Sequence, residues 1–217
     1  WNYDEPDTLF RSKSNPELAP LEQQLDEAIF ELYGLSQSER NLIEDMCSVG
    51  FELLYRKTSK KATSRVDFAL QKSHGTLSDL TKTLSNDIAL QNYLMTFLQI
   101  WNRELEPGGE FSWRVIRPAN VPMIAVIFTT QEKGQIVPQE NLDDTFDWHE
   151  VLQRCAKVLQ QPVSRRIYID RMIRVVTDTQ IYIIKKDERR LWTNSMARED
   201  ADATRLQAIH LQQPEAL

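Results

Sequence analysis

The stretch Glu110–Phe128, EFSWRVIRPANVPMIAVIF, is where the hydrophobic pattern of the chain changes its period. Residues 110–117 alternate between apolar and polar or charged side chains, which is typical of a strand with one face turned to a core. Pro118-Ala-Asn120 supplies a turn, and the mostly apolar residues 121–128 predict a second, central strand. The stretch therefore predicts an antiparallel hairpin.

The residues before this hairpin follow a helical period. Helices are expected at about 21–33, 36–56 and 87–105, where apolar residues recur every three or four positions. Gly34 is placed to end the first helix, because glycine readily adopts the left-handed conformation of a helix stop. Ser36 and Glu39 have the spacing of a capping box that begins the next helix.

The residues after the hairpin mix both periods. A helix is expected from Asp147 to about Gln160, with Asp147 and Glu150 as its capping box, and a last helix from Asn194 or Ser195 to about His210. Strands are expected at 166–170, 172–176 and 180–184, joined as an antiparallel meander.

This order of elements predicts an α+β fold. The expectation is an N-terminal helical part packed with an antiparallel sheet of about four to five strands and a C-terminal helix. Three segments are expected: an extended N-terminal segment at 1–20, a helical subdomain at 21–106 and an α+β subdomain at 107–217, together forming one compact unit. Because the chain begins with Trp1, we expect it to be a processed chain or a piece of a longer one.

Composition sets the class of protein. The 217 residues carry a formal net charge of −6, which argues against general electrostatic binding of nucleic acid by the whole surface. No apolar run approaches the roughly 18 residues of a membrane span. Cys47 and Cys155 lie in apolar helical patterns and are expected to be two buried thiols, so we expect a cytoplasmic protein without a membrane partner.

Catalytic motifs are missing from the sequence. None of the six glycines forms the G-x-G of a nucleotide-binding loop, and His74, His149 and His210 lack neighbours at metal-ligand spacing. Asp170, Asp178 and a lysine at 185 or 186 resemble a metal-dependent nuclease set, but Ile183 occupies the position where a carboxylate should precede the lysine. We therefore expect neither a catalytic residue nor a metal site in this chain.

Cations gather in the C-terminal half, where a DNA-binding site is expected. Lysine and arginine contact phosphates, and arginine also reads guanine edges. The candidate DNA-binding residues are Arg114, Arg117, Arg165, Arg166, Arg171, Arg174, Lys185, Lys186, Arg189 and Arg190. Two alternatives remain open: a half-exposed sheet with cross-strand charge pairs, and contact with another protein. The polar run Lys57–Arg65 reads as a solvated loop, with DNA backbone contact as the lesser alternative.

Three stretches of the sequence carry a family resemblance. They are LDEAIFELYGLSQSE from Leu25, FLQIWNRELEPGGEFSWRVIRP from Phe97, and RRLWTNSMAREDAD from Arg189. They resemble segments beyond the catalytic domain of amino-methylating adenine DNA methyltransferases in bacterial restriction-modification and phage-defence systems. Asn194 departs from that pattern, in which an arginine is expected. The resemblance spans roughly residues 21–207 and contains no catalytic motif.

Two functional hypotheses follow. The resemblance implies a non-catalytic DNA-positioning or assembly module of such a methyltransferase, with double-stranded DNA and the catalytic domain or other defence subunits as partners. It also implies that S-adenosylmethionine serves the parent enzyme, and no cofactor is expected in this chain. The alternative is a protein-interaction or scaffold module of a bacterial defence complex without DNA contact, which the amphipathic helices at 21–56 and the acidic balance favour.

Overall fold

The computed structural model describes residues 18–51, 61–67, 73–82, 89–135, 144–160 and 172–212. The chain divides into two compact units, Trp1–Ile43 and Glu44–Leu217. Among the described helices, none has the length and apolar character needed to cross a bilayer. The expected strand at 166–170 lies outside the described residues.

The first unit is built around a helical stop and restart. Helix α2 (Ala19–Leu32) ends at Gly34, whose φ of +62° and N–H bond to the Glu31 carbonyl complete the stop together with the Leu35 N–H bond to Phe30. Helix α3 (Gln37–Asp45) then begins at the capping box. The Ser36 N–H donates to the Glu39 carboxylate at 2.8 Å, and the Glu39 N–H reaches Ser36 Oγ at 3.4 Å.

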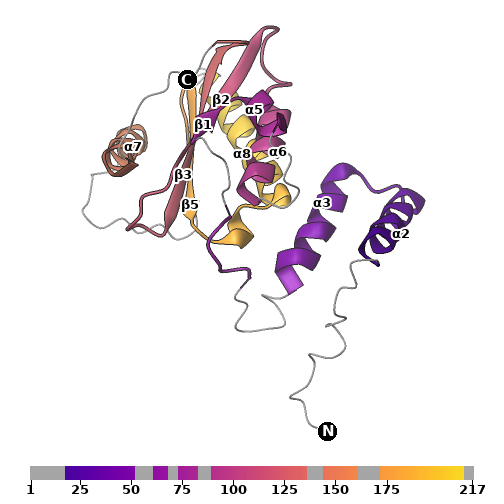
Figure 1. The fold of residues 1–217 in the computed structure, drawn as a ribbon. Coiled ribbons are helices and arrows are strands. Elements are labelled where there is room, and N and C mark those ends of the chain that lie inside the picture. Colours follow the sequence, from indigo (N-terminus) through magenta and orange to yellow (C-terminus); the bar gives the residue numbers. More distant parts are fainter. Residues whose placement is uncertain are drawn as a thin grey trace. The chain divides into compact units, whose positions relative to one another are not determined.

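The second unit contains a five-stranded antiparallel sheet in the order β1-β2-β3-β5-β4 (Figure 1). The strands are β1 (His74–Gly75), β2 (Gly109–Ile116), β3 (Met123–Glu132), β4 (Met172–Val176) and β5 (Gln180–Lys186). The predicted hairpin is β2–β3, with Trp113 opposite Phe128, and the predicted meander is β4–β5. The structure thus confirms the α+β class, the number of strands and the C-terminal helix.

Helices cover both faces of this sheet. On one face lie α5 (Leu77–Lys82), α6 (Ala89–Trp101) and α8 (Asn194–Gln212), and on the other lies α7 (Asp144–Val158) (Figure 1). Phe97 of α6 stacks on Phe128 of β3 with ring centroids 4.0 Å apart. Helix α7 covers a second set of apolar side chains, which alternate along the strands with those that face α6 and α8. Ile116 belongs to this second set and is completely buried. The sheet is therefore sandwiched at its centre rather than half exposed.

Several element ends differ from the sequence-based expectations. Helix α7 begins at Asp144, so Asp147 lies inside it and does not start it. Helix α6 ends at Trp101 rather than near 105. Helix α3 passes into a π-helical turn, η1 (Met46–Gly50), and this turn leaves Cys47 exposed. The expectation of a buried Cys47 was wrong, whereas Cys155 is buried and its burial raises the thiol pKa to about 11.

Candidate nucleic-acid interface

The structure sorts the ten candidate DNA-binding residues into three groups. Arg165, Arg166 and Arg171 lie outside the described residues. Arg174 and Lys185 are held by Asp200 inside the second unit. The other candidates lie on or near the sheet surface: Arg114, Arg117, Lys186, Arg189 and Arg190. Arg114 is half buried on β2 opposite His74 of β1, away from the end of β5.

Strand alternation separates the two lysines at the end of β5. Because successive side chains point to opposite faces, Lys185 enters the core below α8 and Lys186 is exposed. Lys185 has no exposed surface, and its ammonium group donates to the Leu191 carbonyl at 3.0 Å and to the Asp200 carboxylate. A DNA phosphate cannot reach Lys185 in this arrangement.

Asp200 lies at the centre of a buried polar cluster of Tyr93, Arg174, Lys185 and Asp200 itself. Its carboxylate accepts hydrogen bonds from Tyr93 Oη at 2.5 Å and from Arg174 Nε at 2.9 Å, in addition to the Lys185 ammonium. The ammonium also lies 4.9 Å from the centre of the Tyr93 ring. Burial, reinforced by the Asp200 charge, raises the pKa of Tyr93 well above its usual value. This cluster ties α6, α8, β4 and β5 together and serves the fold.

A second cluster forms where β5 ends. The loop 61–67 is bonded to the segment after β5: the Arg189 N–H donates to the Ser64 carbonyl and the Arg190 N–H to the Ala62 carbonyl, each at 3.0 Å. Ala62 and Val66 are buried and anchor the loop. Both of these N–H donors belong to the short 3-10 helix η2 (Arg189–Leu191). The loop and η2 therefore lie side by side, and their charged side chains gather in one place.

Asp187 organises the arginines at this place. Its side chain is only 1% exposed and accepts from Arg65 Nε at 2.9 Å, from Arg117 Nε at 2.9 Å and from the Val66 N–H at 2.9 Å. Burial alone would raise the pKa of this carboxyl group, but the backbone N–H and the two guanidinium groups lower it. The carboxylate is therefore charged at neutral pH and fixes both arginine heads.

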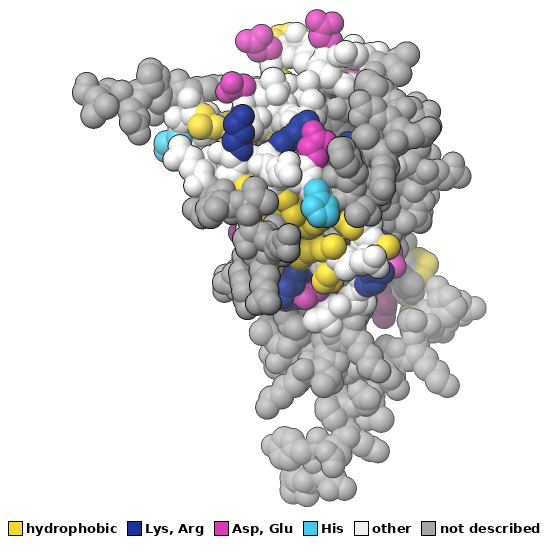
Figure 2. Space-filling model, turned by 90° about the vertical axis from the view of Figure 1, so that its left-hand side faces the viewer, with side chains coloured by type: hydrophobic (Ala, Val, Ile, Leu, Met, Phe, Trp, Pro, Cys, Tyr) yellow, Lys and Arg dark blue, Asp and Glu magenta, His cyan; other side chains and the backbone are white. Residues whose placement is uncertain are grey.

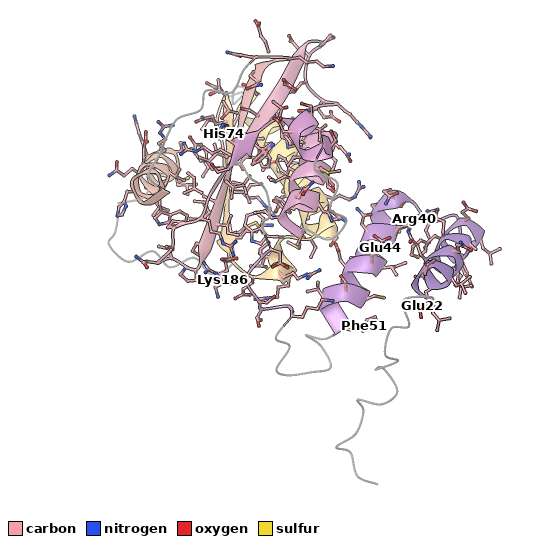
Figure 3. The ribbon with its side chains drawn as sticks, in the orientation of Figure 1. Glu22, Arg40, Glu44, Phe51, His74 and Lys186 are labelled. Carbon is pink, nitrogen blue, oxygen red and sulfur yellow. The ribbon has the colours of Figure 1, made fainter. Side chains whose placement is uncertain are left out.

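The result is a surface that we call the basic corner. It consists of six cations around the end of β5: Lys61, Arg65, Arg117, Lys186, Arg189 and Arg190. The same segments contain three carboxylates, Asp67, Asp187 and Glu188. Asp187 pairs with Arg65 and Arg117, and Glu188 pairs with Arg190 at 2.8 Å. Arg65 remains 63% exposed despite its bond to Asp187, and Lys186 projects at the end of the sheet (Figure 3). Cations therefore exceed acids at this corner of an acidic chain.

The face of the molecule on the α7 side has a different character. Figure 2 shows hydrophobic side chains gathered at its middle, with cations and acids scattered among polar groups. Exposed charge pairs, such as Arg154 with Glu150 on α7, neutralise each other there. The described part of this face offers no continuous positive surface, so the basic corner is the better candidate for phosphate contact.

Two features of the basic corner were not the main expectation from the sequence. Lys61 and Arg65 lie in a run that was expected to be a solvated loop, with DNA backbone contact as the lesser alternative, and Asp187 reads as one of several acids between cations. The contact that joins Arg65 to Asp187 spans 122 positions. A contact between residues so far apart leaves no pattern in the local sequence. The cations at 185–190 are close together in the sequence and did indicate the other part of the basic corner.

Within the described ranges, no group of three or more His, Cys, Asp and Glu side chains is placed to hold a metal ion. Comparisons with protein-family models, curated proteins and solved structures found no significant match.

Proposed function

We propose that this chain is a non-catalytic DNA-positioning or assembly module of an adenine-specific DNA methyltransferase in a bacterial restriction-modification or phage-defence system. The observation that carries DNA positioning is the basic corner, where a buried carboxylate holds two arginines beside further cations. Phosphate contacts of this kind orient a duplex without reading its sequence. The methyltransferase assignment rests on the three sequence stretches that resemble that family.

The arrangement of Arg65 and Arg117 suits a contact with phosphate. Each guanidinium group has five N–H donors. Arg65 uses its Nε on Asp187 and is largely exposed, so donors remain toward solvent. A preorganised arginine loses less conformational entropy on binding than a mobile one. Lys186 adds a charge that is strongly hydrated and free of any geometric requirement.

The test is duplex binding by charge-matched variants. The variant Lys186→Gln/Arg190→Gln removes two cations from the basic corner, and Arg103→Gln/Lys133→Gln removes two exposed cations elsewhere. With a random-sequence duplex at about 0.1 M salt, we expect the corner variant to bind roughly fivefold or more weakly, because each phosphate contact adds to affinity. The control should change affinity less than about twofold. Equal losses for both variants would remove the basic corner from the account.

A second candidate function is a protein-interaction module without DNA contact. The observation that favours it is the set of exposed leucines on α2, which no other described feature of the chain explains. If the chain binds no duplex but forms a stable complex with another protein of a defence system, this second function replaces the first.

A further inference from the structure

Helix α2 and the residue that precedes it, Leu18, carry an exposed apolar face that we call the leucine seam. Its five members recur at spacings of three, four, four and three: Leu18, Leu21, Leu25, Ile29 and Leu32. With 3.6 residues per turn, these positions fall within an arc of about 80°. All five are exposed, and Leu21 and Leu25 are 58% and 61% exposed. A continuous apolar stripe of this kind marks a contact surface rather than scattered surface leucines.

The opposite side of α2 is already occupied. Phe30 is buried, and the Arg40 guanidinium of α3 lies 5.4 Å from the centre of its ring. Arg40 also forms an ion pair with Glu27, and its Nε donates to the Leu35 carbonyl at 3.1 Å. Arg40 therefore lies against α2 (Figure 3), and the inner side of the helix is explained within the first unit. The leucine seam is left facing outward.

The geometry of the seam indicates a helical partner. From Leu18 to Leu32 the seam takes four steps over 14 residues, an average period of 3.5, which is the period of a coiled-coil contact. A seam of this period fits one partner helix lying along α2, with the exposed Ala28 at the edge of the contact.

The charges on α2 indicate which kind of helix would pair with the leucine seam. Helix α2 contains four acids and no lysine or arginine: Glu22, Asp26, Glu27 and Glu31. Glu22 and Glu31 flank the seam at the positions where a paired helix places its own charges. A second copy of α2 would bring acids against acids, which disfavours self-pairing. A partner whose apolar seam is flanked by lysine or arginine would form attractive pairs instead.

We propose that the leucine seam of α2 docks an amphipathic helix of another protein or domain with lysine or arginine on either side of its apolar stripe. The proposal specifies the partner chemistry for the assembly part of the proposed function and rests on that part. It does not depend on the basic corner.

The test uses two synthetic helical peptides of about three heptads, with leucine at the a and d positions. One peptide carries lysine and the other glutamate at the e and g positions. Binding to the full chain is measured by fluorescence anisotropy. We expect the lysine peptide to bind at least tenfold more tightly than the glutamate peptide, since its charges complement the acids of α2. Equal affinities for the two peptides would overturn the proposed partner.

Variants of the chain locate the binding. Leu21→Gln/Leu25→Gln removes the centre of the seam, and Leu206→Gln/Leu211→Gln removes two leucines of α8 that are 59% and 58% exposed. We expect the seam variant to bind the lysine peptide roughly tenfold or more weakly and the α8 control within about twofold. Circular dichroism verifies that both variants fold. Equal losses would place the binding elsewhere and overturn the proposal.

Two further readouts separate this proposal from others. Duplex binding by Leu21→Gln/Leu25→Gln should match the wild type, so a failure of DNA binding and a failure of peptide binding are distinct results. Sedimentation velocity examines the chain alone. If the chain forms a dimer that the seam variant abolishes, a second copy occupies the seam, and the proposal of a basic partner helix is overturned. A monomeric chain supports the proposal.

Discussion

At the scale of single residues, the most consequential side chain is Asp200. It is completely buried and holds Lys185, Arg174 and Tyr93 together. In the sequence, Asp200 lies in the first half of the expected C-terminal helix, next to Glu199. Its burial instead depends on β4, β5 and α6, which lie far from it in the sequence, so helix position alone could not reveal its role.

Replacing Asp200 with asparagine should cost about 3–5 kcal/mol of unfolding free energy, because it leaves the buried Lys185 without its counter-charge. The matched control is Glu199→Gln, the neighbouring residue, whose side chain is 62% exposed and which reaches Arg174 only at 3.4 Å. That change should stay within about 0.5 kcal/mol. Urea denaturation measures both. A loss below about 1 kcal/mol for Asp200→Asn would show that the cluster is unimportant for stability.

Asp187 gives a pH-dependent prediction. The folded protein lowers the pKa of Asp187 below its ordinary 3.8, since the Val66 N–H and two arginines outweigh its burial. Its stabilising contribution is therefore fully present above about pH 4 and is lost as the pH falls through the folded pKa. Urea unfolding of the wild type and Asp187→Asn should differ most near neutral pH, with the gap narrowing below about pH 4. A gap that stays constant down to about pH 2 would contradict this account.

At the scale of elements, local motifs were predictable and contacts between distant elements were not. The stop at Gly34 and the Ser36–Glu39 box involve neighbours within a few positions, and both occur as expected. The start of α8 differs. Thr193 Oγ1 accepts from the Met196 N–H at 3.4 Å, and Asp45 accepts from the Ser195 N–H at 2.7 Å. Helix α8 begins at Asn194, as expected, but its first turn is capped by Thr193 and by a carboxylate 150 positions away, which supplies the shorter bond.

This long-range cap yields a prediction for α8. Asp45→Ala removes the acceptor of the Ser195 N–H and should cost about 1 kcal/mol, as loss of a helix cap does. The control Asp202→Ala removes an exposed carboxylate within α8. Hydrogen exchange of the first turn of α8 should rise in Asp45→Ala and stay unchanged in the control. Unchanged exchange at Ser195 in Asp45→Ala would refute the cap.

At the scale of the whole molecule, the α+β class followed from the change of hydrophobic period near residue 110. The presence of helices on both faces of the sheet did not follow from the sequence. Arg114 and Ile116 share one face of β2, and that mixture of charge and apolar side chain reads as a surface, whereas α7 buries Ile116. The basic corner was predictable in part: four of its cations were named as candidate DNA-binding residues, whereas Lys61 and Arg65 lay in a run with DNA contact only as a lesser alternative and join them through the fold.

The central claim is that this chain holds DNA through phosphate contacts at the basic corner. The most direct test is equilibrium binding of the full chain to a random-sequence duplex across a series of salt concentrations. The account predicts an affinity that falls linearly on a log–log plot, with a slope of roughly −3.5 to −5.5 for the release of counterions by four to six cations. Absence of binding at about 50 mM salt, or an affinity independent of salt, would contradict it.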